Sequence, residues 1–185
     1  MKHKGTAAIE TQRLILRKIT ADDTEAAFRN WESDEKVTEF LCWTPMTMRE
    51  VETVTNEWIE RYSDEKFYLW VIVPKALGEP IGSISVVEME EKAEKVQIAY
   101  CIGHKWWHQG YASEAFAAII PFLFKEVGVC RIEAHHDPDN PNSGKVMAKC
   151  GLKYEGTLKK ADWSNRGIVD SCIYGLTAED YFQKL

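Results

Sequence analysis

The residues with the clearest capacity for chemistry lie at 107–115, where the chain reads W-H-Q-G-Y-A-S-E-A. Gly110 and Ala112, a glycine and a small residue two apart, allow the backbone to turn sharply where a helix begins. Unpaired N–H groups at such a helix terminus and the helix dipole both favour a bound anion. The segment therefore predicts a site for a pyrophosphate, with Ser113 placed to cap the helix or to reach a phosphate.

The spacing of this turn excludes two common phosphate motifs. A P-loop requires G-x-x-x-x-G-K-[ST], and the dinucleotide fingerprint requires G-x-G-x-x-G after a first strand. Neither motif occurs. The turn at 107–115 contains a single glycine, Gly110, and it lies in the middle of the chain. The remaining G-x-A turn is also compatible with an ordinary strand-to-helix connection that holds no ligand.

A second segment, 139–152, narrows these alternatives. It reads D-N-P-N-S-G-K-V-M-A-K-C-G-L. Asn140 is a good helix N-cap, Pro141 suits the first helical position, and Gly151 suits the end of the helix. The segment predicts a short helix whose first turn carries Ser143.

With R-L-I-L-R at 13–17, these segments give the chain a specific resemblance. It resembles a GCN5-related N-acetyltransferase (GNAT) of the branch that contains the ribosomal-protein alanine N-acetyltransferases. The resemblance implies an α/β (α+β) fold, with a mixed, mostly antiparallel sheet of about seven strands, a splayed central pair and flanking helices. It also implies acetyl transfer from the cosubstrate acetyl-CoA to an amine.

The resemblance assigns roles to particular residues. Main-chain groups of residues 100–102 would bind the pantetheine arm, and N–H groups of residues 108–113 would bind the pyrophosphate. Asn140 and Ser143 would face the same arm, although Asn140 has a rival role as a plain helix cap. The expected acetyl-CoA contacts are Tyr100, Cys101, Ile102, His108, Gln109, Gly110, Tyr111, Ala112, Ser113, Asn140, Ser143 and Met147.

The acid and base of the reaction are less clear from the sequence. Met147 stands where many GNAT enzymes carry a tyrosine that protonates the leaving thiolate, and Gln97 stands where the branch often has a glutamate. A thiol with a pKa near 8.5 leaves readily, so a dedicated acid is dispensable. We take His136 as the candidate base, since histidine titrates near neutral pH. The alternative is that His135 and His136 merely alternate across a strand end, one packed and one solvated.

The elements that must position these residues follow from hydrophobic patterning and turn signals. Strands are expected at 13–19, 68–73, 81–87, 96–102 and 129–136, and a hairpin at 154–163 and 168–176. Capping boxes at Thr20 and Thr47 predict two helices, and Thr177 predicts a short closing helix. A helix at 113–127 should kink at Pro121. The resemblance implies that the segment between Trp31 and Trp43 forms a wall of the acceptor site. Packing in the hydrophobic core is the alternative role for these two tryptophans.

Composition limits the function classes. The 185 residues form one domain, 1–185, and the net charge of −6 argues against a nucleic-acid partner. Five cysteines without a C-x-x-C pair favour a reduced cytoplasmic protein with no disulfide framework and no metal site. No apolar run predicts a signal peptide or membrane span. The oligomeric state is open, with a homodimer as one alternative.

Three functions remain from the sequence. The leading one is acetylation of the N-terminal α-amine of a protein, a ribosomal protein among the candidates, by direct attack in a ternary complex. The second is acetylation of a small-molecule amine such as a polyamine, an amino acid or an antibiotic. The third is a non-catalytic acetyl-CoA-binding module, which the absence of an acid or base at Met147 and Gln97 motivates.

Overall fold

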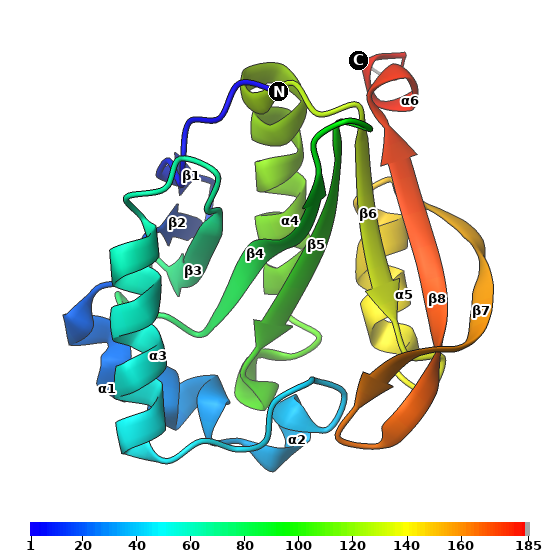
Figure 1. Cartoon of the computed structure of the whole chain (residues 1–185). Helices are drawn as coiled ribbons and strands as arrows, with labels where there is room; N and C mark the ends of the chain where they lie inside the picture. The colour runs from blue at the N-terminus through cyan, green and yellow to red at the C-terminus, as the bar shows by residue number, and fades with distance from the viewer. Residues whose placement is uncertain (184–185) are drawn as a thin grey trace.

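The computed structural model describes residues 1–183 as a single twisted sheet with helices on both faces (Figure 1). The eight strands run in the order β1-β2-β3-β4-β5-β6-β8-β7. All neighbours are antiparallel except β5 and β6, which are parallel. The strands are β1 (Ile9–Glu10), β2 (Leu14–Arg17), β3 (Leu69–Pro74), β4 (Gly82–Glu90), β5 (Lys95–Ile102), β6 (Arg131–His136), β7 (Lys153–Ser164) and β8 (Gly167–Thr177).

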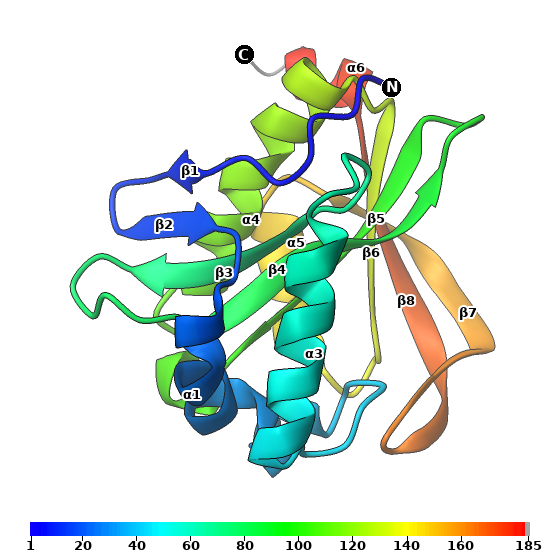
Figure 2. The same cartoon turned by 60° about the vertical axis from the view of Figure 1, so that its left-hand side comes forward.

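Two separate hydrophobic clusters fix the helices to opposite faces of the sheet. The larger cluster packs α4 (Tyr111–Pro121) and α5 (Pro141–Lys149) against one face. The smaller cluster packs the α1 (Thr24–Ala27) region and α3 (Met48–Arg61) against the other face, where α2 (Glu35–Thr38) also lies (Figures 1 and 2). The side chains of successive strand residues alternate between these two clusters, as the strand period of two requires. The short α6 (Ala178–Phe182) follows β8.

The central parallel pair is splayed, as the family resemblance implies. β5 and β6 pair only through Lys95–Arg131, Val96–Ile132 and Gln97–Glu133. Beyond Gln97 the two strands diverge, and β5 leads towards the start of α4 (Figure 1). The remaining residues of β5 therefore have no strand partner on their β6 side, which leaves their backbone groups on that side available to a ligand.

Several local predictions are confirmed. Thr47 and Glu50 form a reciprocal capping box at the start of α3, and Thr177 accepts a hydrogen bond from the backbone N–H of Asp180. Pro141 occupies the first turn of α5, and Gly151 adopts φ +93° just after it. The hairpin of β7 and β8 turns between Ser164 and Gly167.

Two expected helices are less regular than the patterning predicts. The capping box at Thr20 is present, but residues 21–32 form a 3₁₀ turn, the short α1 and a π-type turn instead of one helix. Pro121 is the last residue of α4, and a π-type turn follows over Phe122–Val127. Proline lacks the N–H that would continue the regular ladder, so the change of helix type at this residue has a direct cause.

The tryptophans divide between core and surface. Trp31 and Trp70 are fully buried, as expected of core residues, whereas Trp163 is 59% exposed on β7. No helix within residues 1–183 combines the length and the apolar character needed to cross a membrane.

Candidate functional site

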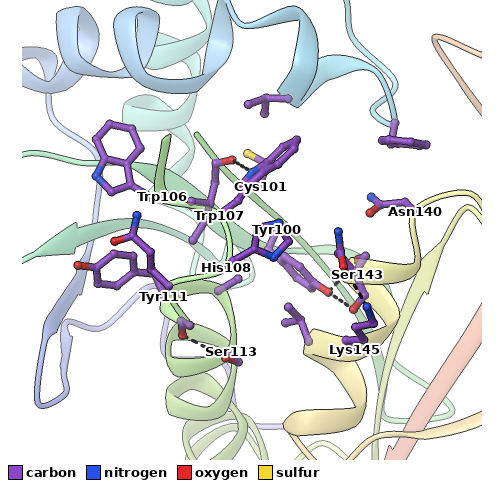
Figure 3. Close-up of a pocket in the computed structure, with 18 of the residues that line it drawn as sticks. Tyr100, Cys101, Trp106, Trp107, His108, Tyr111, Ser113, Asn140, Ser143 and Lys145 are labelled. Carbon is purple, nitrogen blue, oxygen red and sulfur yellow. Dashed lines mark hydrogen bonds between the residues drawn. The ribbon is translucent and has the colours of Figure 1, made fainter. Parts of the chain in front are cut away.

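A cavity of about 540 Å³ opens where β5 parts from β6 (Figure 3). Its walls are the end of β5, the first turns of α4 and α5, and residues of α2 with the loop that follows it. All the acetyl-CoA contacts expected from the sequence line this cavity, except Met147. Three stretches that are far apart in the sequence, 36–41, 100–113 and 139–149, are thereby brought to one cleft that reaches both faces of the sheet.

The first wall is the turn that precedes α4. Gly110 has φ +81° and His108 has φ +60°, so two residues of this turn lie in the left-handed region. The first intrahelical hydrogen bond runs from Glu114 N to Gly110 O at 3.0 Å, which leaves the N–H groups of residues 111–113 without a helical partner. The hydroxyl of Ser113 donates to Gly110 O at 3.0 Å, so it braces the turn from inside. The free N–H groups form a site suited to a phosphate.

Two cations border this turn, and motif reading alone did not find them. A Cβ placed on Gly110 would lie 3.4 Å from Arg13 Nη2 and 4.0 Å from Lys149 Nζ. Arg13 is held by an ion pair with Glu114 (Nε to Oε2, 2.6 Å) and by a hydrogen bond from Nη1 to Gln109 O at 3.1 Å. Arg13 belongs to the R-L-I-L-R pattern at 13–17, so the sequence carried a signal for it, whereas Lys149 had no signal beyond its charge.

The second wall is the first turn of α5. The Tyr100 hydroxyl lies 2.9 Å from both the carbonyl and the hydroxyl oxygen of Ser143, which ties β5 to α5 across the splay. Burial raises the pKa of Tyr100 well above its usual range, so this hydroxyl stays protonated. The Asn140 side chain makes no capping hydrogen bond, so the prediction of a side-chain cap is wrong. Its backbone is in place at the start of the helix, and its side chain lines the cavity.

α5 approaches the sheet closely because residue 144 is glycine. A Cβ at Gly144 would lie 2.6 Å from His136 Nε2 and 3.1 Å from the Tyr174 hydroxyl. The His136 ring thus lies beneath α5, with Nδ1 2.7 Å from Asp137 O, and it does not line the cavity. Met147 is fully buried in the larger cluster and does not line the cavity either. The structure therefore does not bring these two residues to the cleft, and their proposed roles stay predictions.

The third wall faces α2, and a clamp holds it in place. Val37, Phe40 and Leu41 line the cavity on this side. Asn165, in the turn between β7 and β8, donates from Nδ2 to Thr38 O at 2.8 Å and to Trp43 O at 2.7 Å. This turn reaches across the open end of the splay to the loop after α2 (Figure 1).

Beside the clamp, the Arg166 guanidinium lies 5.2 Å from the Phe40 ring centroid and pairs with Asp137 and Asp139. The backbone N–H of Asn165 also donates to Leu41 O at 3.0 Å, so the clamp fixes the loop that carries Phe40 and Leu41.

Cys101 lines the cavity, and its environment keeps it inert. Burial, together with the nearby charge of Glu32, raises the pKa of Cys101 to about 12. A thiol is nucleophilic only as the thiolate, so Cys101 is neutral and unreactive near pH 7. The cavity is therefore suited to direct transfer between two bound substrates, without an enzyme-bound intermediate on this residue.

Glu32 is a buried carboxyl that the sequence did not single out. Its side chain is 2% exposed, and Oε1 accepts a hydrogen bond from Trp31 Nε1 at 2.7 Å, while Oε2 has no partner. Burial raises the pKa of Glu32 to about 7, and the Trp31 indole only partly offsets this. The Trp43 indole lowers it further, although Trp43 Nε1 makes no hydrogen bond of ordinary geometry.

The arrangement combines an anion-binding turn, two adjacent cations and a cleft whose strand edge has unpaired backbone groups. Such a cleft can hold a long ligand by its phosphate end and align its other end with a second substrate, which makes the reaction effectively unimolecular. Within residues 1–183, no cluster of three or more His, Cys, Asp or Glu side chains is placed to hold a metal ion.

Comparison with known proteins gives consistent matches. A family model described as an acetyltransferase (GNAT) domain matches residues 13–153. The uncharacterised N-acetyltransferase YoaA of Bacillus subtilis (strain 168) is 28% identical over 168 residues, which cover 91% of this chain and 95% of YoaA. The [ribosomal protein uS5]-alanine N-acetyltransferase of Escherichia coli (strain K12) is 36% identical over 84 residues, or 45% of this chain and 43% of that enzyme.

The fold also matches solved structures. Mycobacterium smegmatis RimJ, solved in complex with CoA-disulfide, superposes with a TM-score of 0.85 at 21% identity, covering 97% of this chain and 91% of that one. YoaA and the uS5 enzyme are both named as N-acetyltransferases, so the sequence alternative of a non-catalytic binding module finds no support in these names.

Proposed function

The chain belongs to the GNAT acetyltransferase family, and on that premise we propose that it acetylates the N-terminal α-amine of a protein. As an acetyltransferase of this family, it takes the acetyl group from acetyl-CoA. The observation that carries the proposal is the cleft at the β5–β6 splay, whose two ends differ in character. One end has the free N–H groups and cations of the α4 turn, and the other is lined by Val37, Phe40 and Leu41, next to the segment that Asn165 holds.

For the donor, we infer that the diphosphate lies over the N–H groups of residues 108–113, next to Arg13 and Lys149. The pantetheine arm then runs along the unpaired edge of β5, past Tyr100, Cys101 and Ile102, with Asn140 and Ser143 on the other side. A backbone N–H on this edge would polarise the thioester carbonyl. Such a donor lowers the activation free energy by on the order of 3 kcal/mol.

For the acceptor, two observations favour a protein N-terminus. The match to the uS5-alanine N-acetyltransferase is the strongest in identity among the relatives described above, although it spans less than half of either chain. The other is the wall of Val37, Phe40 and Leu41, whose apolar side chains can pack on the first side chains of a peptide. An α-amine has a pKa of about 7.7–8.0, so a useful fraction is neutral and nucleophilic at physiological pH.

The test is a panel of acceptors with release of the CoA thiol as the readout. Short peptides with free Ala, Ser or Met at the N-terminus are compared with the same peptides blocked at the N-terminus and carrying a free lysine. Spermidine and free amino acids represent small amines. The proposal expects acetylation of the free peptides, located at the α-amine by mass spectrometry. Acetylation confined to the small amines, or to lysine side chains, would contradict it.

A further inference from the structure

A histidine other than His136 stands where the central strands part. The last residues paired across β5 and β6 are Gln97 and Glu133. We call the point just beyond this pair the splay apex. Along β6, Ile132 and Ala134 pack into the larger cluster, on the α4 and α5 face. His135 therefore points to the opposite face, and it is the first residue of β6 beyond the apex to do so.

The side chains of β5 alternate between the two faces of the sheet in the same way. Ile98 and Ile102 pack into the larger cluster, whereas Cys101 packs into the smaller one on the α1 and α3 side. The cavity is lined by residues 100–102 of β5 and by α2 residues such as Val37, so it reaches this second face. His135 thus stands on the same face as Cys101, on the strand that parts from β5, and it lies beyond the residues that line the cavity itself. His136 lies on the other face, under α5.

The imidazole of His135 is held so that one nitrogen is buried and the rest of the ring is partly open. Nε2 is buried without a hydrogen-bond partner, and its nearest carboxylate oxygen is Glu133 Oε2 at 3.9 Å. The side chain as a whole is 21% exposed, so its accessible part lies away from Nε2. The negative charge of Glu133 favours a proton on Nε2, which leaves the lone pair on Nδ1. Glu133 itself is fixed by Lys95 at 2.9 Å and Arg131 at 2.7 Å.

The charges that face His135 come from several strands. Three carboxylates act on it: Glu133 of its own strand, Asp162 of β7 and Glu88 of β4. Lys95 of β5 is the opposing cation, and it pairs with Glu133. These carboxylates would attract a protonated amine. Burial is nevertheless the largest influence on His135 and lowers its pKa, so the ring is neutral near pH 7 and able to accept a proton.

We propose that His135 takes the proton from the acceptor amine at the splay apex, and that the surrounding carboxylates draw that amine in as an ammonium ion. This deepens the proposed function, since it names the proton acceptor of the same site. It applies equally to any amine that the enzyme acetylates.

The step balances as follows. The ammonium gives one proton to the imidazole, and its nitrogen lone pair forms the C–N bond to the thioester carbonyl. The C–S bond then breaks with its electron pair, and the thiolate takes the second proton of the nitrogen through solvent. The imidazolium returns its proton to water, so that each turnover yields an amide, CoA thiol and one proton.

The test compares His135→Gln and His136→Gln with wild type, using whichever amine wild type acetylates fastest. This choice separates the inference from the identity of the acceptor. His3→Gln, which removes a histidine bonded to Tyr68 and Glu91, is the matched control. We expect His135→Gln to lower kcat by roughly 10²–10⁴. Its pH profile should lose the limb due to the histidine, and its affinity for acetyl-CoA should stay within about twofold of wild type.

A second variant guards against a folding defect. In His135→Ala, added imidazole should restore part of the lost rate, in proportion to the concentration of neutral imidazole. A purely structural role of His135 would not produce this rescue. A kcat for His135→Gln within threefold of wild type would overturn the proposal. So would a rate loss without any change of pH profile and without imidazole rescue, or the same losses appearing in His136→Gln instead.

Discussion

The buried carboxyl of Glu32 makes the stability of this protein depend on pH in a defined direction. Its pKa rises from 4.5 in the unfolded chain to about 7 in the folded protein because burial disfavours the charged form. Between these two values the folded state keeps a proton that the unfolded state has lost. The free energy of unfolding therefore falls as the pH rises through this window, and the loss is complete above about pH 7.

The size of the effect follows from the same values. At about 1.4 kcal/mol per pH unit, ionisation of Glu32 costs the folded state about 3 kcal/mol above pH 7. Glu32→Gln has no proton to lose, and it retains an oxygen that can accept from Trp31 Nε1. The unfolding free energy of Glu32→Gln minus that of wild type should therefore increase by about 3 kcal/mol between pH 4.5 and pH 8. This corresponds to roughly 6–12 °C in Tm for a chain of this size.

The assay is urea unfolding followed by far-ultraviolet circular dichroism at several pH values across this range. Taking the difference between the two proteins cancels the other titrating groups and any fixed change in hydrogen bonding at residue 32. Glu57→Gln, an equal change of charge at an exposed position on α3, is the control and should show no such trend. A difference that stays constant within 0.5 kcal/mol across the range would refute the reasoning.

Three further predictions concern the cleft itself. Gly110→Ala should weaken acetyl-CoA binding about tenfold, because a Cβ is strained at φ +81° and would crowd Arg13; Gly128→Ala, at φ +78° with open space around it, should leave binding unchanged. Tyr100→Phe and Ser143→Ala should each cost about 0.5–1.5 kcal/mol in urea unfolding. The two costs should be non-additive, because the hydrogen bond between the two hydroxyls is lost in both variants; full additivity would mean that this bond contributes nothing. Asn165→Ala should raise KM for the acceptor more than KM for acetyl-CoA, because it frees the loop after α2 that Asn165 holds. Equal effects on both KM values would contradict the placement of the acceptor beside this loop.

The sequence predicted those parts of the fold that depend on local chemistry. The capping box at Thr47, the turn at Gly110 and the first turn of α5 at Pro141 are each encoded within a few neighbouring residues. Local signals were less reliable where the backbone had competing options. The Asn140 side chain leaves the helix end that it was expected to cap, and the segment after Asp23 forms mixed helical turns instead of one helix.

Long-range contacts at the site could not be predicted in this way. Arg13 and Glu114 are about a hundred positions apart, and only the packing of β2 near the start of α4 brings them together. The Asn165 clamp likewise depends on how far the β7–β8 hairpin reaches. The alternation of β6 side chains between the two faces of the sheet, by contrast, could be predicted from the sequence. Ile132 and Ala134 are apolar at alternate positions, so His136 belongs to their face and His135 to the other.

The most direct measurement of the central claim is calorimetric titration of the protein with acetyl-CoA and, separately, with acetyl-pantetheine, which lacks the diphosphate. If the N–H groups before α4, with Arg13 and Lys149, hold the diphosphate, acetyl-CoA binds saturably at one site and acetyl-pantetheine binds far more weakly. Equal affinity for the two compounds, or no binding of acetyl-CoA, would contradict the account.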